Sequence, residues 1–554
     1  MFKENSRELF FGLLIAAIAF LIYANSLGNG LTLDDHEVIL DTRVLKGNAL
    51  SLFTMVDAVA DAQKLPFYRP LTNMTFLFDG RLHNFNTFYI RLFNVLFHSG
   101  NAFLVYLLAR LLFKGDKFTP LLIGLIFAIH PLHTEGVNFN AGGRITIMAC
   151  FFALASYLVH IRSALQSNIF LAYAGAILFL AGLFSKEIAL MVFPLIVALE
   201  ISVFRSDSTT RRWQQSCLRL APYFAAVSVY LVMRWITLSK LGMQTSILPG
   251  IGTKTMESMF ITTDFNTRML NNLYIIPRYL LTAVWPTALC NRYVIPDDLN
   301  LLALPLFCSW SIILTALTWL LARGRSAVTL FGISWMILFW LPVSGIVFVP
   351  GAPLADRFIY IPAIGFWIII ADQIKRALPW EKPTVRRYGP VIFALVLLIL
   401  AGLTVRRNLD WRSNLTLYTR FVAQYPENVH ARAGLGKAYY DRGREQNTDL
   451  AEREFEKVVS MDPNFPMIFT FLGNISLNKE NLNSALYNYS KAIEVYPYDK
   501  EARLNRGITL EKLGRPKEAI TDYLFFLTSP GNPGDIIGGR EHAQNRIKEL
   551  SKLN

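Results

Sequence analysis

The chain has 554 residues, of which 53% are hydrophobic and only 17% are charged. Soluble domains rarely reach this hydrophobic fraction over such a length, so the composition indicates a polytopic membrane protein. The formal net charge of +14 does not indicate a nucleic-acid partner, because Lys and Arg come in short clusters between apolar runs, as in cytoplasmic loops. We therefore expect contacts with membrane lipids and none with nucleic acid.

The sequence contains eleven apolar runs that are long enough to cross ~30 Å of hydrocarbon. The first, residues 9–27, has no small-residue cleavage site and predicts a membrane helix rather than a removable signal. The others lie at 88–113, 119–135, 145–162, 168–184, 187–204, 217–236, 301–321, 328–349, 357–374 and 388–405.

A twelfth apolar segment, residues 269–290, is interrupted by Pro277, Arg278 and Pro286. If it does not cross the membrane, every basic loop falls on one side, as the positive-inside rule requires. The rule thus favours eleven spans, an interfacial or re-entrant helix at 269–290, and a C-terminus on the outer face. Most of the unusual polar motifs then gather on that face, and ionisable groups near a membrane usually mark a site.

After about residue 406 the composition turns polar and a period of 34 residues appears. Ala451 and Phe455 recur as Ala485 and Tyr489, and then as Ala519 and Tyr523; Gly473 and Gly507 keep the same step. This is the tetratricopeptide period, in which small residues let paired helices approach. We predict a membrane domain at 1–406 and a domain of about three and a half repeats at 407–554, with a concave surface that binds a protein.

The stretch LTLDDHEVIL places Asp34, Asp35, His36 and Glu37 just after the first membrane helix. A carboxylate at the water–membrane boundary can act as a general base toward a hydroxyl group when its neighbours hold its pKa near the working pH. The alternative is that Asp34 and Asp35 only cap a short interfacial helix.

Three basic residues in other motifs could bind an anion. In FYRPLTN, Arg69 offers a planar fork that suits a phosphate, although a surface Arg near lipid headgroups gives the same pattern. Arg144 follows two glycines and is a second possible anion contact. Lys186, in the motif SKE, either pairs with Glu187 or reaches a ligand.

Two further motifs lie at predicted outer helix ends. HPLHTE contains His133 and Glu135, but its spacing matches no standard zinc motif, so a turn that orders the helix ends is favoured over a metal site. LADRFIY contains Arg357, which could hold a lipid-linked phosphate or anchor the helix to headgroups, and Tyr360 one turn further on.

Within the run 88–113, Arg91, Asn94 and His98 share one helix face. Such a stripe can line a site or hydrogen-bond a neighbouring helix. For Asn94 and His98 we favour hydrogen bonds between helices.

In series, these motifs resemble the transmembrane and tetratricopeptide-repeat O-mannosyltransferases and their bacterial relatives, which are GT-C glycosyltransferases. The resemblance covers nearly the whole chain. It implies an all-α GT-C membrane fold with a tetratricopeptide α-solenoid, and transfer of one sugar from a polyprenyl-phosphate donor to a protein or glycan hydroxyl. It implies no cofactor, and we expect no divalent metal.

The resemblance also implies roles for residues. Asp34 matches the catalytic acid that follows the first span, with Asp35 as the alternative base. Tyr68-Arg69-Pro70 is similar to the Tyr-x-Lys-Pro element that holds the donor phosphate. The implied phosphate-binding residues are Arg69, Arg144, Lys186 and Arg357, and the implied substrate contacts are Tyr68, His36, Glu37, His133, Glu135 and Tyr360.

The short repeat array resembles bacterial members, so we expect a bacterial inner membrane protein whose site and repeats face the periplasm. The competing prediction is a lipid or glycolipid transporter or flippase with a docking domain. Transporters usually place ionisable residues at the bilayer midplane on broken helices, whereas the charges here lie at predicted outer helix ends.

Overall fold

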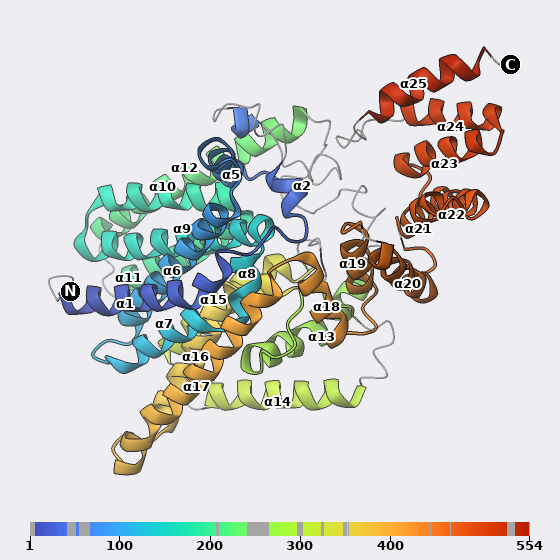
Figure 1. Cartoon of the computed structure of the whole chain (residues 1–554). Coiled ribbons are helices and arrows are strands. Elements are labelled where there is room, and N and C mark those ends of the chain that lie inside the picture. The colour runs from blue at the N-terminus through green and yellow to red at the C-terminus, as the bar shows by residue number, and fades with distance from the viewer. Residues whose placement is uncertain are drawn as a thin grey trace. The chain divides into compact units, whose positions relative to one another are not determined.

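The computed structural model describes residues 6–40, 51–54, 67–205, 210–240, 265–295, 303–322, 326–346, 352, 354–443, 445–465, 467–528 and 538–552. In these residues every regular element is a helix. The chain forms two compact units, Met1–Ser413 and Asn414–Asn554, which are described separately below (Figure 1).

The first unit is a helical bundle whose short connections include 3-10 turns. Its helices are α1 (Ser6–Tyr23), α2 (Asp35–Ile39), α5 (Pro70–His83), α6 (Thr87–Leu112), α7 (Phe118–Ile129), α8 (Thr134–Asn138), α9 (Asn140–Gln166), α10 (Ile169–Ser185), α11 (Val192–Arg205), α12 (Thr210–Lys240), α13 (Phe265–Val284), α14 (Ala303–Ala322), α15 (Ala327–Trp340), α16 (Pro362–Ala377) and α17 (Pro383–Asp410). The turns named below are η1 (Ala24–Ser26), η4 (Glu187–Met191) and η8 (Asp356–Ile359).

Five helical segments in the described part of the chain are long and apolar enough to cross a membrane, which makes this a multi-pass membrane protein. They are Ser6–Ser26, Thr87–Leu112, Asn140–Gln166, Trp213–Ser239 and Pro383–Asp410. The helices Phe118–Ile129 and Pro131–Asn138, which are bent by 46° relative to each other, make a sixth if they form one span.

Four of the remaining five predicted runs form helices of 17 residues or fewer, and the fifth forms α14, which has 20 residues. The run 168–184 becomes the 17-residue α10, and the run 187–204 is divided between η4 and the 14-residue α11. The other three correspond to α14, α15 and α16. The segment 269–290, expected not to cross, lies largely in α13, which contains Pro277.

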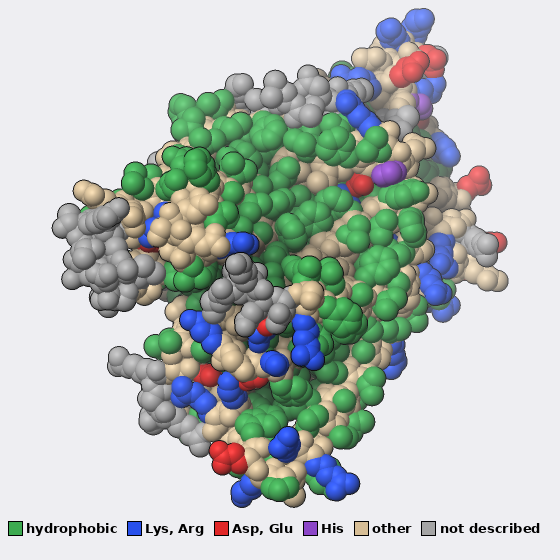
Figure 2. All heavy atoms as spheres, turned by 90° about the vertical axis from the view of Figure 1, so that its left-hand side faces the viewer, with side chains coloured by type: hydrophobic (Ala, Val, Ile, Leu, Met, Phe, Trp, Pro, Cys, Tyr) green, Lys and Arg blue, Asp and Glu red, His purple; other side chains and the backbone are tan. Residues whose placement is uncertain are grey.

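The spans differ in how much of their surface protein covers. In α9, 61% of the apolar window is buried, whereas in α17 only 11% is buried. A helix with apolar residues all round its surface needs lipid or protein around it, so α9 is an interior helix and α17 presents a face to lipid. Figure 2 shows apolar side chains over much of one face of the protein.

The second unit is a row of paired helices, which confirms the predicted tetratricopeptide repeats. Its helices are α18 (Asn414–Gln424), α19 (Val429–Tyr440), α20 (Glu445–Met461), α21 (Ile468–Asn478), α22 (Leu482–Val495), α23 (Lys500–Lys512), α24 (Pro516–Thr528) and α25 (Gly539–Leu550).

The same contact holds each repeat together. A Cβ on Gly473 would lie 2.5 Å from the ring of Tyr489, and one on Gly507 would lie 2.6 Å from the ring of Tyr523. Gly436 faces Phe455 in the same way. The aromatic ring of the second helix therefore occupies the space that a side chain on the glycine of the first helix would need.

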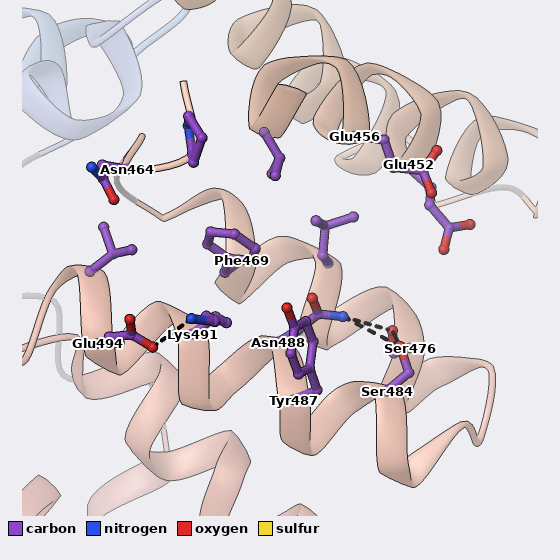
Figure 3. A pocket seen from close by; sticks show the side chains of 14 residues that line it. Glu452, Glu456, Asn464, Phe469, Ser476, Ser484, Tyr487, Asn488, Lys491 and Glu494 are labelled. Carbon is purple, nitrogen blue, oxygen red and sulfur yellow. Dashed lines mark hydrogen bonds and ion pairs between the residues drawn. The ribbon is translucent and has the colours of Figure 1, made fainter. Parts of the chain in front are cut away.

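A hollow of about 540 Å³ opens between α20, α21 and α22 (Figure 3). Ser476 lines it, three residues after Gly473; at the same step the neighbouring repeats carry Tyr439 and Leu510. The small serine leaves space that a large side chain would fill. The lining includes Val459, Phe469 and Leu472 as apolar residues, and Glu452, Glu456 and Asn488 as polar ones.

Candidate functional site

Asp35 is an anchor of the fold. It is fully buried, and its carboxylate accepts hydrogen bonds from the Thr32 N–H at 3.0 Å, the Asn140 side-chain amide at 2.8 Å and the Ala141 N–H at 2.7 Å. These bonds join the loop after α1 to the start of α9. Because both carboxylate oxygens of Asp35 accept hydrogen bonds inside the protein, the carboxylate stabilises the loop after α1.

Asp34, its neighbour, is exposed. It stands at the N-cap of α2 but makes no capping hydrogen bond with its side chain, so the capping alternative does not describe it. The surrounding protein restricts its hydration and raises the pKa of Asp34, while the positive charges of Arg357 and Arg292 oppose this rise. A carboxylate with a raised pKa, near two guanidinium groups, has the properties of a general base.

Arg357 is held in place by Glu135. The buried Glu135 carboxylate accepts a hydrogen bond from the Arg357 N–H at 2.8 Å and a second from the Arg357 guanidinium, which also donates to the Asn291 carbonyl at 3.2 Å. The Arg357 side chain remains 17% exposed, compared with 2% for Glu135. Glu135 therefore orients a cation that can still reach a ligand.

Lys186 and Arg69 supply two further positive charges. Lys186 caps the end of α10 and donates to the Thr146 hydroxyl at 3.0 Å. Burial lowers the pKa of Lys186 to about 7, and the charge of Arg69 acts in the same direction. Arg69 forms an ion pair with Glu187 at 3.1 Å. Lys186 and Arg357 both lie near the ring of Phe358, at 5.9 Å and 4.8 Å.

The structure thus brings together residues that are far apart in the sequence. The positive charge of Arg357 interacts with the Asp34 carboxylate. Lys186 interacts electrostatically with Arg69, Glu187, Arg357 and Glu135. Asp34 thus lies near Arg357, and Arg357 lies in a group with Lys186 and Arg69 in which Glu135 and Glu187 pair with the two arginines. This arrangement can deprotonate a hydroxyl group and stabilise a leaving phosphate.

Arg144 and Tyr68, also predicted to contact substrate, lie inside the protein. Arg144 is fully buried, and its guanidinium donates to the Asn94 side chain, the Thr75 hydroxyl, the Ile90 carbonyl and, at 2.5 Å, to Asp79. The Tyr68 hydroxyl donates to the Phe53 carbonyl at 2.9 Å. Both residues support their neighbours in the bundle.

His133 and Tyr360 belong to a second buried cluster. The Tyr360 hydroxyl lies 2.7 Å from His98 Nδ1 and accepts a hydrogen bond from the Asn101 amide at 3.1 Å. His133 packs against the Tyr360 ring, and neither of its ring nitrogens has a hydrogen-bond partner among the described residues. His133 ends a short 3-10 turn, Pro131–His133, that lies between α7 and α8. His36 and Glu37 are exposed on α2.

Sequence reasoning did not identify Arg292 as a site residue, although its charge acts on Asp34. It follows the segment 269–290 that is expected not to cross the membrane, and no recognisable motif surrounds it. The sequence places Arg91 on one helix face with Asn94 and His98, but it gives no sign of the hydrogen bonds that Arg91 makes to the Asn29 and Gly30 carbonyls. Among the described residues, no group of three or more His, Cys, Asp or Glu side chains could hold a metal ion.

Comparison with known proteins gives distant relatives over most of the chain. The protein O-mannosyl-transferase F38B6.6 of Caenorhabditis elegans is 25% identical over 466 residues, which are 82% of this chain and 63% of that protein. TMTC3 of Mus musculus, also a protein O-mannosyl-transferase, is 24% identical over 602 residues, which are 94% of this chain and 64% of that protein. The chain spans a little under two thirds of the length of these relatives.

A sequence profile of the tetratricopeptide-repeat family matches residues 399–447. Among solved structures, MamA MSR-1 C2 is 23% identical over 25% of this chain and 87% of its own, with a TM-score of 0.19, and we draw nothing from that likeness. The chain is thus distantly homologous to protein O-mannosyl-transferases and carries a tetratricopeptide repeat.

Proposed function

We propose that the protein is a GT-C glycosyltransferase that moves one sugar from a polyprenyl-phosphate donor to an acceptor hydroxyl, with inversion at the anomeric carbon. Asp34 takes the proton of the hydroxyl group as its oxygen attacks that carbon. The bond from the carbon to the phosphate oxygen breaks, and the phosphate leaves with the electron pair. Arg357, Lys186 and Arg69 stabilise the negative charge that develops on it.

The observation that carries this proposal is the contrast between two adjacent aspartates. Asp35 is fully buried with three hydrogen-bond donors around it, whereas Asp34 is exposed near Arg357 and Arg292. The homology to protein O-mannosyl-transferases supports the sugar donor and the protein acceptor.

We place this reaction on the periplasmic face of a bacterial inner membrane, in a domain at 1–406 with eleven spans. The repeats at 407–554 lie on the same side and engage a protein acceptor. The hollow lined by Ser476 supports this role, because apolar side chains and charged groups of both signs, including Glu456 and Lys491, line a space that a peptide side chain can enter.

The test is transfer by the purified full chain, with polyprenyl-phosphate mannose as donor and a serine-containing peptide as acceptor. Loss of a general base costs roughly 100- to 10,000-fold, so we expect Asp34→Asn to lose transfer by that factor and to unfold at the wild-type temperature. Asp35→Asn should lower both the rate and the unfolding temperature. Wild-type rates in Asp34→Asn would remove this residue as the base.

A further inference from the structure

The loop from Gly28 to Asp34, between η1 and α2, is held by the end of the last membrane helix. The Asn29 side-chain amide donates to the Asn408 carbonyl at 2.8 Å. The Gly30 N–H donates to the Arg412 carbonyl at 3.1 Å. Asn408 lies in the last turn of α17, where its carbonyl also accepts the Trp411 N–H at 3.3 Å, and Arg412 follows the end of that helix.

Arg91 of α6 fixes the same part of the loop from a second direction. Its guanidinium donates to the Asn29 carbonyl at 2.9 Å, to the Gly30 carbonyl, and to the Asn138 carbonyl at 3.2 Å. Arg91 is only 1% exposed and Asn29 only 3% exposed. Charged hydrogen bonds away from water are strong, so the loop is clamped at these two residues.

On the other side of Asp34, Asp35 ties the chain to the start of α9 through Asn140 and Ala141. Asp34 is therefore bracketed by two attachments. One is to an interior helix, and the other is to the end of α17, whose backbone continues through Ser413 into α18.

We propose that Asn29 is a positioning residue for the transfer reaction, which sets the place of Asp34 relative to Arg357 by docking the loop onto the end of α17. This inference rests on the proposed function. The segment that leads into the repeats thus takes part in building the site.

Asn25, which is exposed whereas Asn29 is buried, provides a control at the same helix end. Its side-chain amide donates to the Val405 carbonyl at 2.8 Å, and its side-chain oxygen accepts a hydrogen bond from the Asn408 amide at 2.8 Å. It therefore joins η1 to the end of α17, but no described hydrogen bond of its side chain reaches the loop. Asn25→Ala removes bonds to the same helix end without releasing residues 28–34.

The experiment compares Asn29→Ala, Asn29→Asp and Asn25→Ala in the full chain. Asn29→Asp keeps the side-chain volume but places an acceptor opposite the Asn408 carbonyl. We expect both Asn29 variants to lose about tenfold in kcat, the size of one buried hydrogen bond, with an unchanged KM for the donor. We expect Asn25→Ala to keep the wild-type kcat.

Hydrogen–deuterium exchange over residues 27–34 gives a second readout, independent of activity. It should become faster in both Asn29 variants and stay as in the wild type in Asn25→Ala. Equal losses of kcat in Asn25→Ala and Asn29→Ala, or unchanged exchange in the Asn29 variants, would overturn the inference. If the wild type transfers no sugar, the proposed function fails, while the exchange rates still decide whether Asn29 holds the loop.

Discussion

The repeat unit and the polar end of the membrane unit are held together by contacts of different kinds. In the repeats one contact recurs, a glycine of the first helix against an aromatic ring of the second, as in Gly473 with Tyr489. Around Asp34 each contact occurs once, between residues as distant as Asn29 and Asn408. When a contact recurs in every repeat, losing it in one repeat leaves the others intact. In a network where each contact occurs once, losing any contact changes the arrangement around Asp34.

The largest effect is expected where a single contact compensates a buried charge. Arg357→Leu removes the guanidinium that pairs with the Glu135 carboxylate, which is 1% exposed, and leaves only the backbone N–H of residue 357 as a donor. Removing one partner of a buried pair costs about 3–5 kcal/mol of unfolding free energy, and transfer should be lost as well. Thermal unfolding in detergent and the transfer assay measure the two effects.

The double variant Glu135→Leu with Arg357→Leu is the control for this charge effect. It should recover most of the stability, because apolar residues often replace a buried ion pair without loss, but it should not recover transfer. Wild-type stability in the single variant would show that Glu135 does not depend on Arg357.

A smaller effect is expected from breaking one repeat. In Gly473→Ala the new Cβ would lie 2.5 Å from the Tyr489 ring, and such overpacking costs about 1–3 kcal/mol. Hydrogen exchange in α21 and α22 should accelerate while transfer to a short peptide persists. Gly402→Ala is the control, since no atom lies within 4 Å of its Cβ position; equal exchange in both variants would contradict the packing argument.

The pH dependence of donor binding tests the charge of Lys186. Burial lowers the pKa of Lys186 to about 7, so its ammonium form is present below that pH and is lost as the pH rises. The KM for the donor should therefore increase by up to about tenfold for each pH unit above 7. Lys186→Arg stays charged and should flatten this dependence; a flat profile in the wild type would exclude Lys186 as a phosphate ligand.

The smallest effect is expected from filling the hollow in the second repeat. Ser476→Tyr places there the residue type found at Tyr439. We expect the KM for a protein acceptor to rise about three- to tenfold, which corresponds to roughly 1 kcal/mol of binding free energy, with no change for a short peptide. Ser460→Tyr on the exposed face of α20 is the matched control, and equal KM values in the two variants would rule the hollow out.

The sequence predicted the repeats well because their contacts are local and periodic. It also singled out Asp34, Arg69, Lys186, Glu135 and Arg357, since charged residues beside apolar runs are conspicuous. It could not separate Asp34 from Asp35, because adjacent residues of one type differ only in what surrounds them.

Composition and periodicity by themselves determined an all-α membrane protein with a trailing repeat array, because hydrophobic runs and a fixed 34-residue step are properties of the chain. The tertiary structure decided which charged residues are buried among hydrogen-bond partners and which remain exposed. It buried Arg144 among four acceptors and left Asp34 exposed near Arg357. The burial and the hydrogen bonds of a residue depend on helices that are distant in the sequence, so a local sequence pattern cannot predict them.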